Sequence, residues 1–170
     1  SVLAVMEQEL AQLRTREPEL PLDIVFHTPI WDPSGYADEG RAIARALAAS
    51  ERRLLLSEIR WSEARCELRA DHAALFRALL AAKRPRFTAA ITNCIATLVS
   101  PDPLASVNVL RTANETDRVP PLWHERLGQF DEVWVLSQYS AVAFRRSGVP
   151  PEKLRVVSSC VDTETYRPEG

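Results

Sequence analysis

Three residues that could contact a bound ligand stand directly before a helical pattern, namely Ser34, Gly35 and Tyr36. A glycine at the start of a helix lets the backbone come close to an anion held by the first amides of that helix. The chemistry would then be the binding of a phosphate or a similar anion. The alternative is a plain turn in which Gly35 needs a positive φ angle, and spacing alone favours that turn.

A second polar group, Asn114 to Asp117, follows an apolar run farther along the chain. Glu115 and Asp117 place two carboxylates there, beside the side chains of Asn114 and Thr116, which form hydrogen bonds. These groups could bind sugar hydroxyls or orient a neighbouring cation. Helix capping together with a surface turn explains the same residues equally well.

The elements that must position these side chains alternate along the chain. Apolar runs predict strands over 22–27, 53–60, 87–93, 106–113, 131–136 and 154–158, and helical patterns cover 2–16, 37–49, 71–83, 123–127 and 138–147. This alternation predicts an α/β, Rossmann-like fold, with a mostly parallel sheet and helices on both faces. Ligands of such a sheet bind outside the carboxyl ends of its strands, where Asn93 and Ser137 also stand.

Several residues are typical of helix ends. Asp71 is expected to cap the helix over 71–83. The buried side of that helix is expected to carry Leu75, Leu79 and Ala82. Ser137 is expected to cap the helix over 138–147, and Gly148 is expected to end it.

The histidines and the first glutamates are interpreted as structural. His27 ends an apolar run, where a histidine with satisfied hydrogen bonds is expected rather than a catalytic one. His72 is predicted to lie inert on a solvated helix, and His124 is predicted to be structural. Glu9 and Glu17 share one side of the first helical region, which predicts a solvated face.

The chain lacks the spacings of several familiar sites. No metal-ligand pattern, G-x-S-x-G, P-loop or G-x-G-x-x-G occurs in it. We therefore predict no metal and no cofactor, and we assign no catalytic residue.

Composition excludes several classes of protein. The chain has 170 residues, of which 46% are hydrophobic, and this favours one domain over 1–170 rather than a disordered segment. No apolar run reaches the ~18–20 residues of a membrane span. The balance of 21 basic against 23 acidic residues argues against a nucleic-acid surface. Three widely spaced cysteines and a start that does not match a secretory signal predict a cytoplasmic protein.

Three stretches of the sequence resemble family 4 (group 1) glycosyltransferases. The first is Pro33–Ala37 with Arg41, and the second is 111–123, which contains Glu-Thr-Asp and a proline before a tryptophan. The third and most specific begins with Phe-Asp-Glu-Val-Trp-Val-Leu-Ser over 130–137 and continues through Val-Asp to Tyr-Arg-Pro at 166–168.

The resemblance implies half of a GT-B fold, in which two Rossmann-like domains face a cleft. Enzymes of this family transfer a sugar from a nucleotide-sugar donor to an acceptor hydroxyl, with retention and generally without a metal. The chain would be the N-terminal, acceptor-side domain, and the donor-binding C-terminal domain, with its paired glutamates, would lie beyond residue 170. The fragment alone is predicted to be inactive.

The resemblance also implies which residues meet the substrates. The family's glycine loop, which approaches the donor phosphates, corresponds to 34–36, while Glu115 and Ser137 match motif positions near the cleft. Together with the strand-end residues, the predicted substrate-binding set is Ser34, Gly35, Tyr36, Asn93, Asn114, Glu115, Asp117 and Ser137. The expected partners are the nucleotide sugar and the acceptor, with peripheral membrane contact possible. Two alternatives stay open, namely a non-catalytic α/β binding or scaffold domain and a nucleotide-binding or receiver-like domain complete in itself.

Overall fold

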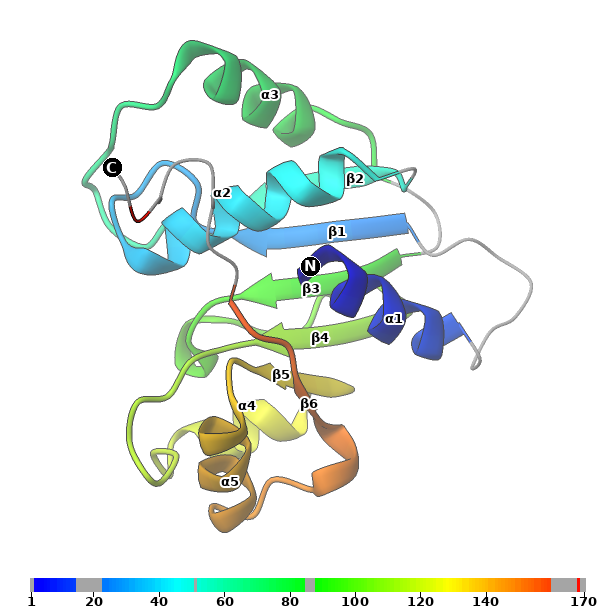
Figure 1. The fold of residues 1–170 in the computed structure, drawn as a ribbon, viewed down its shortest axis with the longest axis vertical. Coiled ribbons are helices and arrows are strands. Elements are labelled where there is room, and N and C mark those ends of the chain that lie inside the picture. The colour runs from blue at the N-terminus through cyan, green and yellow to red at the C-terminus, as the bar shows by residue number, and fades with distance from the viewer. Residues whose placement is uncertain (1, 15–22, 51, 85–87, 160–167, 169–170) are drawn as a thin grey trace.

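The computed structural model describes residues 2–14, 23–50, 52–84, 88–159 and 168 of the chain, and these form alternating strands and helices (Figure 1). The strands are β1 (Asp23–Thr28), β2 (Leu54–Glu58), β3 (Thr88–Asn93), β4 (Val107–Arg111), β5 (Glu132–Val135) and β6 (Leu154–Val156). The helices are α1 (Val2–Arg14), α2 (Gly35–Ala48), α3 (Ala70–Leu80), α4 (Trp123–Gly128) and α5 (Gln138–Arg146), with short 3-10 helices η1 (Ala96–Leu98) and η2 (Pro151–Lys153). Within these described ranges, no helix has the length and apolar character needed to cross a bilayer.

The strands form one six-stranded sheet in the order β2-β1-β3-β4-β5-β6 within the described residues, and every neighbouring pair is parallel. This confirms the predicted α/β, Rossmann-like class. The chain goes from β1 to β2 on one side and then returns to β3 on the other side of β1. In open sheets of this kind, such a reversal opens a crevice beyond the carboxyl ends of the strands.

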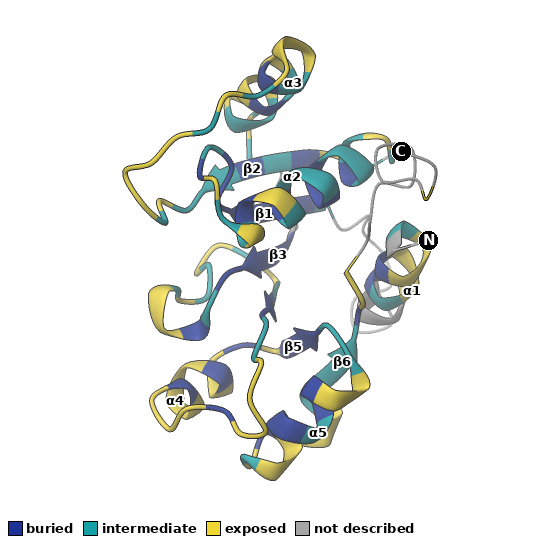
Figure 2. Cartoon of the chain, turned by 60° about the vertical axis from the view of Figure 1, so that its left-hand side comes forward, coloured by how far each residue is buried: buried dark blue, intermediate teal, exposed yellow. Residues whose placement is uncertain are grey.

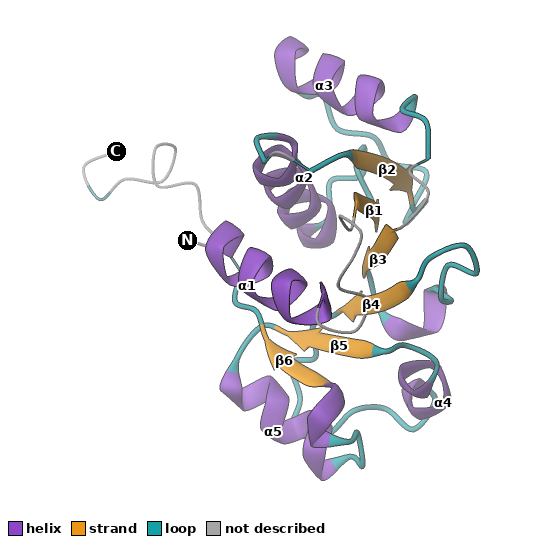
Figure 3. Cartoon of the chain, turned by 90° about the vertical axis from the view of Figure 1, so that its right-hand side faces the viewer, coloured by secondary structure: helices purple, strands orange, loops and turns teal. Residues whose placement is uncertain are grey.

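Helices cover both faces of the sheet (Figure 3). On the face covered by α1 and α2, Ile43 joins Phe26 and Trp134 in one buried cluster. On the other face, Trp123 of α4 and Phe144 of α5 belong to a second cluster. Figure 2 shows the strands buried between these layers, with exposed residues along the outer sides of the helices. Both faces of the sheet are therefore covered, and a ligand could bind only at an edge such as the carboxyl ends of the strands.

The ends of α5 confirm two of the predicted helix boundaries. The Ser137 hydroxyl accepts a hydrogen bond from the Ser140 amide at 3.1 Å, as an N-cap residue does. Gly148 has a φ of +90°, the left-handed conformation that favours glycine just after a helix.

The predicted cap of α3 was wrong, and its buried side was predicted only in part. The N-cap residue is Arg69, and Asp71 lies in the first turn, where its carboxylate binds the Arg69 guanidinium. Ala73 and Phe76 are the buried residues of this helix. The half-buried residues include Leu75, Leu79 and Ala82. Phe76 belongs to the core cluster on this face of the sheet, and Leu79 packs against that cluster while staying partly exposed.

The predicted solvated face of α1 was also wrong. Glu9 is half-buried and pairs with Arg155 of β6 at 3.3 Å, and Arg155 also reaches the buried Glu132 of β5 at 3.3 Å. Burial, opposed in part by Arg155, raises the pKa of Glu9. The charge therefore helps to place α1 on the sheet, while Glu17 lies outside the described residues.

His27 is a satisfied histidine at the edge of the core, as predicted. Its Nε2 donates to the Asp102 carboxylate at 3.1 Å, and the same carboxylate oxygen pairs with Arg84 at 2.8 Å. Burial lowers the pKa of His27, and the hydrogen bond to Asp102 offsets only part of this effect. The folded protein therefore favours the neutral imidazole.

We expect this histidine to make stability depend on pH. An unfolded histidine takes up a proton near pH ~6.5, whereas folded His27 takes it up only at lower pH. The free energy of unfolding should therefore fall as the pH drops from about 7 towards 5, and it should fall less in His27→Gln. Urea unfolding at several pH values measures both slopes. Parallel profiles for the two proteins would contradict the assignment.

Candidate functional site

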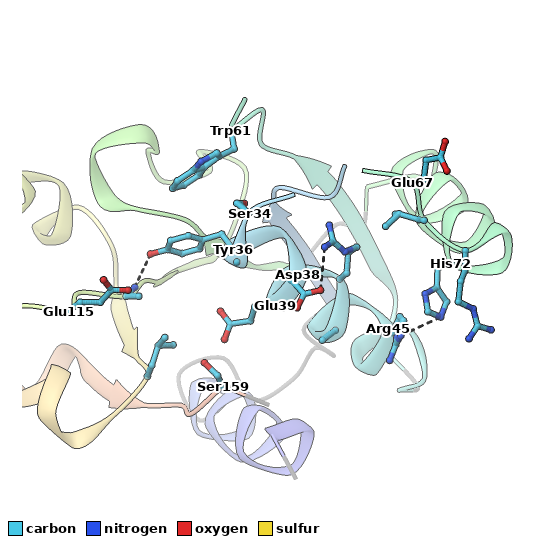
Figure 4. A pocket seen from close by; sticks show the side chains of 17 residues that line it. Ser34, Tyr36, Asp38, Glu39, Arg45, Trp61, Glu67, His72, Glu115 and Ser159 are labelled. Atoms are coloured by element: carbon cyan, nitrogen blue, oxygen red, sulfur yellow. Dashed lines mark hydrogen bonds and ion pairs between the residues drawn. The ribbon is translucent and has the colours of Figure 1, made fainter. Parts of the chain in front are cut away.

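A cleft of about 800 Å³ surrounds the N-terminal half of α2 at the carboxyl edge of the sheet (Figure 4). It receives residues from the segments that follow β1, β2, β4, β5 and β6. The residues nearest the strand ends are Ser34, Gly35, Tyr36, Glu39, Ala113, Glu115, Leu136 and Ser159. This is the position at which parallel α/β sheets bind their ligands.

The loop between β1 and α2 is fixed by its own hydrogen bonds. The Asp32 carboxylate accepts from the Ser34 amide at 2.7 Å and from the Ser62 hydroxyl. Hydrogen bonding by the side chains of Ser34 and Ser62, with a smaller contribution from the Ser34 amide, lowers the pKa of Asp32. Nη1 of Arg41 donates to the carbonyl oxygens of Ile30 at 2.8 Å and Asp32 at 3.0 Å. The start of α2 is therefore held in place before any ligand binds.

The first turn of α2 leaves donors for a ligand. The Ser34 hydroxyl accepts from the Ala37 amide at 3.3 Å, which caps the helix. In the described part of the chain, no hydrogen bond uses the amides of Gly35 and Tyr36. Unpaired amides at a helix N-terminus attract anions, because the helix dipole adds to their own charge.

Gly35 is not a turn glycine. The only glycine with a positive φ among the described residues is Gly148, so the interpretation of Gly35 as a residue that needs a positive φ was wrong. A Cβ atom built at Gly35 would meet nothing within 4 Å. The fold therefore gives no reason for glycine here, and the empty space beside its backbone belongs to the cleft.

Tyr36 and Trp61 form an aromatic wall of the cleft. Their ring centroids lie 5.2 Å apart with an interplanar angle of 28°. The Tyr36 hydroxyl accepts from the Ala113 amide at 2.9 Å and shares a hydrogen bond with the Thr112 hydroxyl at 3.3 Å. Burial raises the pKa of Tyr36, so its hydroxyl stays protonated and the ring is tied to the end of β4.

A buried ion pair lies under the same cleft. Nη2 of Arg111, the last residue of β4, donates to Oε1 of Glu39 in α2 at 2.7 Å. The Arg111 side chain is 0% exposed and that of Glu39 is 15% exposed. The pair holds a carboxylate at the cleft, and our sequence interpretation missed both residues. Arg111 ends an apolar strand, and this charged residue at a strand end was the signal in the sequence that could have indicated the pair.

The predicted binding residues divide into two groups. Ser34, Gly35, Tyr36 and Glu115 line the cleft together, and Glu115 is exposed on the loop after β4. Asn93 is fully buried beneath them, where its Nδ2 donates to the Tyr36 carbonyl oxygen at 3.2 Å. It supports the loop and does not line the cleft.

The other three predicted residues do not line the cleft. Nδ2 of Asn114 donates to the Thr116 carbonyl at 2.9 Å and the Arg118 carbonyl at 3.2 Å, which forms a surface turn. Asp117 is exposed on that turn. Ser137 caps α5. These residues shape the surroundings of the cleft rather than its wall.

One histidine lies closer to the cleft than predicted. His72 of α3 lines the arm of the cleft between α2 and α3, where its Nε2 lies 3.3 Å from the Arg45 guanidinium and its ring packs against Phe76. The prediction of a purely solvated position was therefore wrong. His124, by contrast, is exposed on α4.

The chemistry that the cleft offers is binding. It combines amides that favour an anion, carboxylates that accept hydrogen bonds from hydroxyl groups, and an aromatic wall. Among the described residues, no three His, Cys, Asp or Glu side chains are grouped so that they could hold a metal ion.

Comparison with known protein families, with curated proteins and with solved structures finds no match for this chain. The family resemblance of its motifs therefore stays a prediction from the sequence.

Proposed function

We propose that this chain is the acceptor-side domain of a retaining glycosyltransferase. The proposal rests on the N-terminus of α2, where backbone amides at the carboxyl edge of the sheet are open to a ligand. Gly35 leaves open space there, and the amides of Gly35 and Tyr36 form no hydrogen bond within the described residues. That arrangement suits a diphosphate that approaches the backbone closely.

In the proposed reaction, the acceptor hydroxyl attacks the anomeric carbon of a nucleotide sugar from the face on which the diphosphate departs. The bond from that carbon to the diphosphate breaks, and the hydroxyl proton passes to the departing diphosphate oxygen. The amides of Gly35 and Tyr36 stabilise charge on the departing diphosphate, because they are fixed before the reaction begins. A second α/β domain, following residue 170, would hold most of the donor.

The acceptor would lie along the remainder of the cleft. Glu39 and Glu115 present carboxylates that accept hydrogen bonds from hydroxyl groups. Neither is assigned as a general base.

The described free thiols, Cys66 and Cys94, fit a protein of the reducing cytoplasm.

The proposal is tested with the full-length protein. Nucleotide sugars are supplied with a panel of hydroxyl acceptors, and released nucleoside diphosphate is measured together with the anomeric configuration of the product by NMR. We expect acceptor-dependent release and a product that retains the donor configuration. Residues 1–170 alone should show no transfer.

Three outcomes would contradict the proposal. Inversion at the anomeric carbon, or transfer by residues 1–170 alone, would exclude the proposed division of labour. Ligand binding without any turnover by the full-length protein would favour the non-catalytic binding domain instead.

A further inference from the structure

Hydrogen bonds fix the Tyr36 ring of the aromatic wall. The hydroxyl end of Tyr36 is tied to Ala113 and Thr112, and the Trp61 ring stacks on the Tyr36 ring. Trp61 is only half-buried and lines the cleft, so part of its indole surface stays accessible to a ligand. Figure 4 shows the two rings beside each other, with Glu39 and Glu115 along the same cleft.

The polar groups near this wall suit hydroxyl groups. Oε1 of Glu39 is engaged by Arg111, which fixes the orientation of the carboxylate and leaves its second oxygen available at the cleft. The Glu115 carboxylate and the Ser159 hydroxyl line the same part of the cleft. An aromatic surface bordered by fixed hydrogen-bond acceptors matches a ligand with one apolar face and a polar rim.

The charges of the cleft favour an uncharged ligand at this wall. Among the described residues, each arginine that lines the cleft contacts a partner within the protein, in the pairs Arg41–Asp38, Arg45–His72 and Arg69–Asp71. Three further carboxylates line it, of which Glu39 pairs with the buried Arg111, while Glu67 and Glu115 are the other two. A phosphate or carboxylate beside the two rings would meet the Glu115 carboxylate at a cost, whereas the diphosphate of the donor would lie against the amides of Gly35 and Tyr36.

We propose that the Tyr36–Trp61 wall stacks against the C–H face of an uncharged pyranose ring, so that the acceptor of this cleft is a carbohydrate. This inference rests on the proposed function, which it narrows to one class of acceptor. The C–H bonds of a pyranose face carry partial positive charge, and the face of an aromatic ring is negative. The hydroxyls on the rim of the ring then donate to Glu39 and Glu115.

The full-length protein allows a direct test. The probes are methyl β-glucopyranoside, methyl β-galactopyranoside and methyl α-mannopyranoside, with glucose 6-phosphate as a charged counterpart. Saturation-transfer NMR and tryptophan fluorescence report binding. We expect at least one methyl glycoside to bind, and we expect each glycoside that binds to bind more tightly than glucose 6-phosphate.

Variants of Trp61 test whether the aromatic wall binds the glycoside. Trp61→Ala should weaken glycoside binding about tenfold, whereas Trp61→Phe, which keeps an aromatic ring, should weaken it less. Trp31→Phe is the matched control, because Trp31 lies under Arg77 in a separate pocket and should bind glycosides as the wild type does. The inference is overturned if no methyl glycoside binds, if Trp61→Ala binds as well as the wild type, or if glucose 6-phosphate binds best.

Turnover measured in parallel separates this inference from the proposed function. Sugar transfer to a non-carbohydrate acceptor, unchanged in Trp61→Ala, overturns the inference and leaves the transferase standing. Glycoside binding that depends on Trp61, with no turnover of any nucleotide sugar, supports the carbohydrate site and overturns the transferase.

Discussion

Gly40→Ala should lower the free energy of unfolding by about 3 kcal/mol, although alanine normally favours a helix. Gly40 lies within α2 where this helix crosses β1. A Cβ atom there would overlap the Thr28 side chain and come within 3.2 Å of the Pro29 carbonyl oxygen. Thr28 is fully buried and hydrogen-bonded to Asn93 at 3.3 Å, so relief requires α2 to move away from the sheet.

Chemical denaturation of matched variants measures this effect. Gly35→Ala is the control on the same helix, since its Cβ would meet nothing within 4 Å and it should be at least as stable as the wild type. A loss in Gly40→Ala of less than about 0.5 kcal/mol would contradict the close approach of α2 to β1.

Glu39→Ala should also lower the free energy of unfolding by about 3 kcal/mol. The substitution removes the carboxylate that pairs at 2.7 Å with the Arg111 guanidinium, which is 0% exposed. The buried cation would lose a strong interaction that solvent cannot replace at that position. The effect should therefore exceed that of breaking an ion pair on the surface.

A surface pair of similar geometry provides the comparison. Arg53 is 73% exposed and pairs with Asp23 at 2.9 Å. Arg53→Ala should change the free energy of unfolding by less than about 1 kcal/mol, because solvent screens this pair. Equal losses in the two variants, measured by urea unfolding, would show that Arg111 is not buried as described.

Most of the fold was predictable because apolar runs report burial directly. Each predicted strand is present, and Ser137 and Gly148 mark the ends of α5 as their residue types require. The errors lie where packing decides between similar patterns. Phe76 is the large side chain of α3 that is fully buried, whereas Leu75 and Leu79 are only half-buried, and Glu9 pairs with Arg155 of β6.

The site was predictable only in part. Residues 34–36 follow a strand and form the start of a helix, so their place at the carboxyl edge follows from the alternation of elements. The Glu39–Arg111 pair joins residues 72 positions apart, and it exists because β4 lies beside β3 and near α2. The Tyr36–Trp61 stack depends on the path of the loop after β2. Neither contact can be predicted from the spacing of residue types along the chain.

The central proposal is that a diphosphate of the donor approaches the backbone at Gly35. The most direct measurement is the Michaelis constant of the full-length protein for its nucleotide sugar in the wild type, Gly35→Ala and Gly35→Val, with thermal unfolding recorded for each. We expect this constant to rise about tenfold or more in Gly35→Val, and less in Gly35→Ala, while the unfolding temperature of Gly35→Ala does not fall. Variants that keep both the wild-type Michaelis constant and the wild-type turnover would contradict the claim.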